Sequence, residues 1–245
     1  MTPGTGSPRL SSTPVARAFG AVLSGAFALG RRLRHPRPIH PRGAVLSGHV
    51  RWIPDAEPSG IAWIDRTPDG PVPVVARVSR SIGLPAPLPD IVGLALRVEA
   101  DGEPADIELA STGWTVPARF ALRAHRRVER ARFGTLFPYR GTRGPVLVGA
   151  RTRRGRPAAT DPRELRAADE RTWSLALGHA TALGAWHPFA VVDLRLDDDQ
   201  DDTGLRFDAV RHPLPGSHAY AWVRAARQPS YARVQPAHPE VRMPR

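Results

Sequence analysis

The chain has 245 residues, a formal net charge of +12 at pH 7 and no cysteine. This length allows one large domain with a hydrophobic core, or two small ones. The absence of cysteine excludes thiolate-ligated haem, iron–sulfur clusters, Cys-based zinc sites, disulfides and Cys nucleophiles. It also fits a reducing compartment, and we expect a cytoplasmic protein.

The positive charge comes entirely from arginine, because the sequence contains no lysine. Arginine is accompanied by abundant alanine, glycine and proline, which favours coding bias over selection for a phosphate-binding face. A charge of this size still attracts anions. Nucleic-acid binding is therefore an alternative that rests on charge alone, and we expect no specific nucleic-acid partner.

The N-terminal part of the chain predicts a tail followed by a helix. Residues 1–14 are rich in Pro, Gly, Ser and Thr, which is typical of disorder. Residues 15–33 have helical periodicity, but Arg17 and several glycines make this stretch too short for a transmembrane segment. We expect a single domain over residues 15–235 and a flexible tail over residues 236–245. The sequence does not indicate an oligomeric state.

From Gly43 onward the hydrophobic pattern changes to a period of two, which indicates strands. We expect strands at residues 44–53, 61–65, 71–79, 92–98, 105–110, 145–151 and 186–196. We expect helices at residues 119–133, from residue 161 onward, and in a C-terminal segment carrying Trp222 and Arg227. Many strands at short spacing, with helices outside the run, predict an α+β fold built on a closed antiparallel β-barrel with flanking helices.

Two segments near opposite ends of the chain carry candidate functional residues. Arg37 lies three residues before His40, and Arg227 lies four residues before Tyr231. Together they suggest a flat, doubly anionic ligand held between the two segments. Each residue alone has a simpler interpretation: His40 as a surface-loop residue between prolines, Tyr231 as a packing residue, and the arginines as coincidence.

The order of these residues resembles the catalase superfamily. Arg37, His40, Arg42 and Gly43 match the distal segment of the family, in which an Arg precedes the catalytic His by three residues. Further fragments match in the same order: residues 76–79 with Arg77 and Ser79, residues 90–96, Phe207-Asp208, Pro215-Gly216, Arg227 and Tyr231. The resemblance extends over most of residues 37–231 and implies a small catalase-like or catalase-related haem protein with a catalase-type barrel.

On the proximal side, the resemblance implies haem b with its iron bound by the phenolate of Tyr231, and tyrosine is the axial ligand in catalases. Free tyrosine titrates near pH 10, so the phenolate must be stabilised. Arg227, at the i−4 position, would share a helix face with Tyr231 and favour its ionised form.

On the distal side, the resemblance implies that His40 acts as general base toward a hydroperoxide and then as acid toward the leaving oxygen. Ser79 would orient the imidazole of His40. Arg37 and Arg77 would pair with the haem propionates, because a guanidinium fork fits a carboxylate.

Two departures from the family pattern lower the expected catalase turnover. Where the family carries an Asn pair, this chain has residues 106–112, with Ser111 or Thr112 as weaker substitutes for the distal Asn. In addition, Pro229 interrupts the segment between Arg227 and Tyr231. We therefore expect chemistry on hydrogen peroxide or on organic (lipid) hydroperoxides that is peroxidase-like, with weak catalase activity, or isomerase-like as in catalase-related allene oxide synthases. The alternative is a non-catalytic barrel of the same fold that binds haem, a lipid or another apolar ligand.

Overall fold

The computed structural model describes residues 43–84, 88–157, 172–197 and 204–224. The strands are β1 (Gly43–Trp52), β2 (Val72–Arg80), β3 (Val92–Ala100), β4 (Glu103–Thr112), β5 (Arg132–Gly134), β6 (Tyr139–Gly141), β7 (Gly144–Arg154), β8 (Trp173–Ala180), β9 (His187–Leu196) and β10 (His218–Ala219). The helical elements are α2 (Ala62–Asp65), the 3-10 helices η1 (Ala118–Phe120) and η2 (Val128–Arg130), and residues 221–224.

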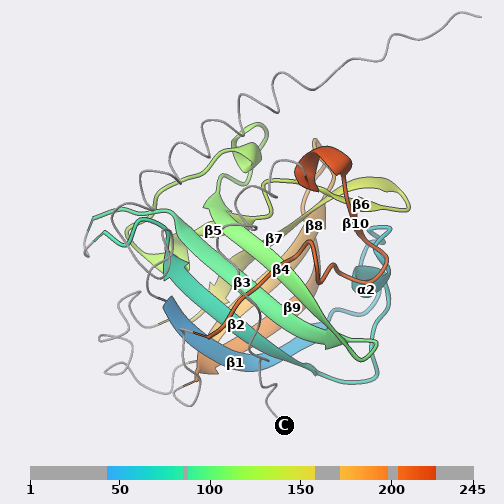
Figure 1. Cartoon of the computed structure of the whole chain (residues 1–245), viewed down its shortest axis with the longest axis horizontal. Helices are drawn as coiled ribbons and strands as arrows, with labels where there is room; N and C mark the ends of the chain where they lie inside the picture. Colours follow the sequence, from blue (N-terminus) through green and yellow to red (C-terminus); the bar gives the residue numbers. More distant parts are fainter. Residues whose placement is uncertain (1–42, 85–87, 158–171, 198–203, 225–245) are drawn as a thin grey trace, which may run out of the picture.

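The strands close into a barrel, which is visible in Figure 1. Hydrogen-bonded neighbours follow the order β7-β5-β4-β3-β2-β1-β9-β8, and β8 also pairs with β7. Every pairing is antiparallel. The predicted closed antiparallel β-barrel of an α+β fold is confirmed, and the described part of the chain contains few helices.

Side chains fill the inside of the barrel. In β2 and β3 the even-numbered residues, such as Val74 and Leu94, belong to the core, so the odd-numbered residues, such as Arg77, face outward. Phe133 and Trp173 meet edge to face in the core, with ring centroids 6.3 Å apart. An eight-stranded barrel leaves room only for its own side chains or for one small ligand. Because bulky apolar groups occupy this interior, a large flat ligand has to bind outside the barrel wall.

Strand β8 closes the barrel, and the hydrophobic pattern of the sequence does not predict it. All eight of its residues are buried, so residues 173–180 lack the polar–apolar alternation that identifies the other strands. Its two edges pair with β7 and β9, so β8 completes the ring of strands.

The prediction of a strand at residues 61–65 is wrong, because this segment forms the short helix α2. Asp65 explains the turn: its carboxylate accepts hydrogen bonds from the backbone N–H groups of Ser59 (2.7 Å) and Gly60 (2.8 Å). Trp63 and Ile64 are buried by the turn that results. The local hydrogen bonds of Asp65 therefore outweigh the strand propensity of the apolar residues.

The prediction of a basic helix at residues 119–133 is also wrong. The segment contains only η1, η2 and the first two residues of β5, with irregular chain between them. Its backbone bonds to the barrel instead of to itself: Arg123 N–H donates to Ser111 O (2.8 Å) and His125 N–H donates to Asp90 O (2.8 Å). These tertiary bonds replace the i→i−4 bonds that a helix would make.

Several predicted features lie outside the described residues. They are the helix at residues 15–33, the helix from residue 161, Arg227 with the rest of the C-terminal helix, and the two tails. Within the described residues, none of the helices is long and apolar enough to span a membrane.

Candidate functional site

Of the six predicted site residues, two lie in the described part of the chain. Arg77 and Ser79 are both in β2. His40 and Arg37 precede the first described residue, and Arg227 and Tyr231 follow the last. The roles assigned to these four residues, including Tyr231 as iron ligand, remain predictions.

Arg77 and Ser79 point to the same side of the sheet, on the outer face of the barrel. Val78 between them belongs to the core. Arg77 is 7% exposed and Ser79 is 3% exposed. A cation and a hydroxyl are thus buried side by side on a barrel wall, which is the arrangement that the predicted anionic ligand requires.

Small residues surround these two side chains on the neighbouring strands. Ser79 lies opposite Gly43 of β1 and opposite Gly93 of β3. Arg77 lies opposite Ala95 of β3. Ser79 therefore has a residue without a side chain next to it on each neighbouring strand.

Gly43 is needed for the position of Arg77. A Cβ atom at residue 43 would lie 2.7 Å from Cζ of Arg77 and 2.8 Å from its Nε, so any side chain there would displace the guanidinium. The guanidinium is therefore packed against the backbone at the start of β1. Gly43 is both the last residue of the distal motif and the first residue of β1.

An apolar cluster borders Arg77 on the outer face. Val45 lies opposite Arg77 in β1. Val45 and Val75 pack with Leu205 and Phe207, and Ala95 contacts the same cluster. The outer face thus offers apolar side chains next to a buried cation.

A network around Asp106 holds the segment that carries Phe207. Residues 204–212 cross the outside of β2, β3 and β4 in Figure 1. Asp106 receives two hydrogen bonds of 2.6 Å from Arg97, and the N–H of Asp208 donates to Asp106 Oδ2 (2.7 Å). Arg97 also donates to the carbonyl of Arg206 (2.7 Å), and its Cζ lies 5.3 Å from the ring centre of Phe207. Phe207-Asp208, part of the motif match, therefore has a structural role here.

Ser111, considered in the sequence as a substitute for the distal Asn, does not face the Arg77 side. It lies opposite the core residue Phe133 and is fully buried. Its hydroxyl accepts from Val92 N–H (2.9 Å) and donates to Arg123 O (2.7 Å). Thr112 donates to the carbonyl of Gly113 (2.9 Å). Both hydroxyls are engaged with the backbone.

Glu108 is a polar residue of β4 on the Arg77 side, and the sequence analysis gave it no role. It lies opposite Ala95, which lies opposite Arg77. The alternation of β4 carries the signal that identifies it: Ile107 and Leu109 are in the core, so residue 108 faces outward. A half-buried carboxylate thus shares this face with Arg77 and Ser79.

Comparison with known proteins relates this barrel to solved structures. No protein-family model and no curated protein sequence matches the chain. A fungal catalase has a similar structure, with a TM-score of 0.55 and 14% identity, over 96% of this chain and 63% of the catalase. The barrel is of the catalase type.

A second solved catalase supports the same conclusion about the fold. Catalase A from Saccharomyces cerevisiae matches with a TM-score of 0.59 and 13% identity, over 94% of this chain and 65% of its own length. The chain therefore spans less than two thirds of the length of these catalases. At this level of identity the similarity is one of fold.

The described residues fit part of a haem site. Arg77 would supply a buried cation for a propionate, and the Val45–Phe207 cluster would supply apolar contact. No group of three His, Asp or Glu side chains converges as metal ligands within the described ranges. The predicted iron ligand, Tyr231, belongs to the C-terminal part beyond them.

Proposed function

We propose that this chain binds haem b on the outer face of β1–β4 and reacts with hydrogen peroxide or organic hydroperoxides, as a peroxidase-like protein with weak catalase activity. The observation that carries the proposal is the burial of Arg77 and Ser79 side by side on the outer face of a catalase-type barrel. The guanidinium fork fits the carboxylate of a haem propionate, and the low dielectric of a buried position strengthens such a pair.

Six residues of the chain would have separate roles in haem binding and in the reaction with peroxide. When bound, haem would supply an iron that activates the peroxide O–O bond. His40 would take the proton from the hydroperoxide and return it to the leaving oxygen, and Ser79 would orient the imidazole of His40. Arg37 and Arg77 would hold the propionates. Tyr231 would ligate the iron, and Arg227 would lower the pKa of its phenol.

The apolar cluster around Phe207 would exclude water from the ligand. It packs on Val45 and Val75 directly beside Arg77. A low local dielectric strengthens the attraction between guanidinium and carboxylate. Because Ser111 and Thr112 are bonded to the backbone, neither replaces the distal Asn, which supports weak dismutation of hydrogen peroxide.

Haem titration tests the proposal. We expect about one haem per chain with a shifted Soret band, and Arg77→Ala should weaken haem affinity by about tenfold or more, since hydrogen bonds between charged groups are the strong ones. Arg153→Ala is the matched control, because it removes the same charge from an exposed position of β7. A protein that stays colourless, with no Soret shift, would refute haem binding and favour a barrel that binds another apolar ligand.

Substitutions at the four residues outside the described ranges test the catalytic roles. His40→Ala should abolish peroxide reactivity and leave haem bound. Tyr231→Phe should remove the tyrosinate features of the spectrum, and Arg227→Ala should alter the spectrum and weaken haem binding. The last two effects should be non-additive, because both residues act on one Fe–O bond. Wild-type spectra in both variants would show that the iron ligand is a different residue.

A further inference from the structure

One end of the barrel combines exposed apolar side chains with positive charge. The strand pairing places the end of β2, the start of β3 and the end of β4 together. We call the described residues beyond these strand ends, 81–84, 88–91 and 113–131, the basic end. Three of its aliphatic side chains are about half exposed: Ile82 (53%), Leu88 (50%) and Leu122 (47%).

Hydrogen bonds hold these three residues on loops that are joined to one another. Asp90 and His125 exchange two backbone hydrogen bonds, of 2.8 and 3.0 Å, which join the β2–β3 turn to the segment after β4. Leu122 forms a bridge with the last residue of β4. The guanidinium of Arg80 donates to the carbonyl of Leu88. Because the loops are held together, their apolar side chains form part of one surface, and such a surface marks contact with a partner.

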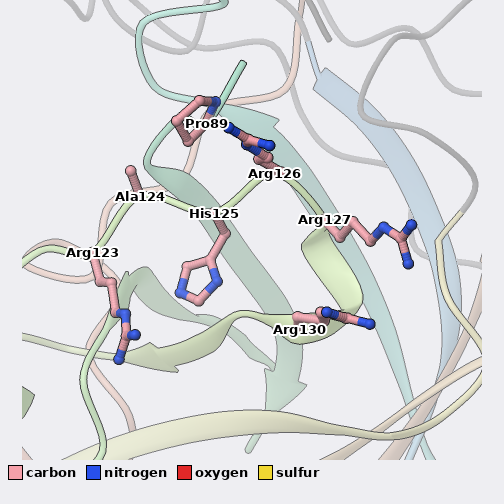
Figure 2. Close-up of a pocket in the computed structure, with 7 residues that line it drawn as sticks. All are labelled: Pro89, Arg123, Ala124, His125, Arg126, Arg127 and Arg130. Atoms are coloured by element: carbon pink, nitrogen blue, oxygen red, sulfur yellow. The ribbon is translucent and has the colours of Figure 1, made fainter. Parts of the chain in front are cut away.

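Four arginines lie beside the apolar side chains. All four are exposed: Arg123, Arg126, Arg127 and Arg130. They line one pocket together with Pro89, and Figure 2 shows Pro89 of the turn next to Arg126 of the segment. Among the described residues, none of the four forms an ion pair. Their charge is therefore available to an anionic partner.

The carboxylates of the basic end do not offset this charge at the surface. Asp90 and Glu129 are the only acids in its sequence. Asp90 is 1% exposed, and its carboxylate accepts hydrogen bonds from the backbone N–H groups of Ile82 (3.1 Å), Gly83 (2.7 Å) and Leu84 (3.1 Å). Glu129 is half-buried in η2. The surface of this end is therefore strongly positive.

The opposite end of the barrel carries the opposite charge. It includes the β1–β2 connection and the β3–β4 turn, because β1 ends beside the start of β2 and β3 ends beside the start of β4. Several acids are exposed there: Asp55, Glu57, Asp69, Glu99, Asp101 and Glu103. A molecule with one basic and one acidic end turns its basic end toward a negative surface.

We propose that the basic end docks on an anionic lipid bilayer. Ile82, Leu88 and Leu122 would enter the interface, and the arginines would pair with the phosphate groups of the lipids. The aliphatic side chains favour a bilayer over a nucleic acid. A phosphodiester backbone offers anions alone, whereas a bilayer offers anions and an apolar phase behind them.

Docking in this orientation would bring the bilayer to the proposed haem site. Ser79 is the last residue but one of β2, and it lies opposite Gly43, the first residue of β1. Both residues are therefore near the basic end. The membrane would then supply lipid hydroperoxides to the site. This consequence rests on the proposed function, whereas docking itself requires no haem.

Co-sedimentation of the full chain with lipid vesicles tests the charge of the surface. Vesicles of phosphatidylserine and phosphatidylcholine in equal parts should bind the protein at least about tenfold more tightly than phosphatidylcholine alone. Binding should weaken as the salt concentration rises. Arg126→Ala and Arg127→Ala should each weaken it about fivefold. Arg66→Ala is the matched control, because Arg66 is exposed beside Asp101 at the opposite end, and it should leave binding nearly unchanged.

The same assay tests insertion of the apolar side chains. Leu88→Ser and Leu122→Ser should each weaken vesicle binding by about tenfold, because the leucine side chain is no longer transferred from water into an apolar phase. Leu183→Ser is the control: Leu183 is 80% exposed, in the loop that joins β8 to β9. That loop is at the opposite end, because β9 begins where β1 ends. Thermal unfolding checks that each variant is folded.

Three results would overturn the proposal. They are no binding to the mixed vesicles, an equal loss in Leu122→Ser and Leu183→Ser, and tight binding of a DNA duplex with vesicle binding that is insensitive to the leucines. The last result would assign the arginines to a nucleic-acid surface. Vesicle binding by a protein that takes up no haem would support docking and refute only the proposed function, so the two hypotheses fail separately.

Discussion

Two arginines on the outer face of this barrel have the same exposure and different surroundings. Arg77 of β2 and Arg97 of β3 are each 7% exposed. Arg97 pairs with Asp106 and donates a hydrogen bond to the carbonyl of Arg206. It therefore holds the segment of residues 204–212 against the sheet. Arg77 packs against Gly43 and lies on the same face as Ser79. On the neighbouring strand β3, Ala95 lies opposite Arg77 and Gly93 lies opposite Ser79. Burial of an arginine thus does not reveal its role, whereas the groups around the guanidinium do.

The largest effect should come from breaking the Arg97 network. Asp106→Ala leaves Arg97 buried without its carboxylate and removes the acceptor for Asp208 N–H, so we expect a loss of about 3–5 kcal/mol in the free energy of unfolding. Urea denaturation measures it. Arg66→Ala, in an exposed ion pair with Asp101, should leave stability nearly unchanged. A similar, small effect of both substitutions would show that Asp106 does not hold the crossing segment.

Two glycines of β1 provide a smaller and more selective test. A Cβ at Gly48 would lie 1.8 Å from the carbonyl oxygen of Asp193 in the neighbouring strand β9, so Gly48→Ala must separate two strands and should cost about 2–3 kcal/mol. At Gly43 the Cβ meets the guanidinium of Arg77, which can move. Gly43→Ala should therefore cost less than about 1 kcal/mol and instead weaken haem binding. Urea denaturation and haem titration separate the two outcomes, and unchanged haem affinity in Gly43→Ala would contradict the position of the proposed site.

The smallest expected effect separates the two serines. Ser111→Ala removes the partner of the buried Val92 N–H and a donor to Arg123 O, and should cost about 1–2 kcal/mol in unfolding free energy. Ser79→Ala should instead slow peroxide consumption by the haem-loaded protein. If Ser111→Ala slows peroxide consumption as much as Ser79→Ala does, the distal side of the proposed site includes the β4 position after all.

The sequence predicted the strands that have one face in the core. In β2, β3 and β4 the alternation of apolar and polar residues is regular, and it places Arg77, Ser79 and Glu108 outward without any structure. The alternation of apolar and polar residues could not predict strand β8, because its eight residues are all buried and show no such alternation. The segment at residues 119–133 was also beyond it, because its backbone partners, Ser111 and Asp90, are distant along the chain.

For the candidate site, ordered motifs predicted a catalase-type barrel, and the comparison of structures bears out that fold. The roles of Arg37, His40, Arg227 and Tyr231 remain predictions, as do haem binding and peroxide chemistry. The motif Phe207-Asp208 illustrates the limit of such matching. It matches the catalase pattern, and in this barrel its backbone and ring serve the Arg97–Asp106 network.

By itself, the sequence determined the class of fold, the absence of thiol chemistry and the outward direction of Arg77 and Ser79, because cysteine content and strand alternation are local properties of the chain. Tertiary structure alone decided that the Ser111 hydroxyl bonds to the backbone of Val92 and Arg123, and that Arg97 bonds to Asp106 and to the carbonyl of Arg206. Each of these depends on strands and loops that meet in space from distant parts of the chain. Backbone hydrogen bonds across the barrel, which no local pattern records, bring them together.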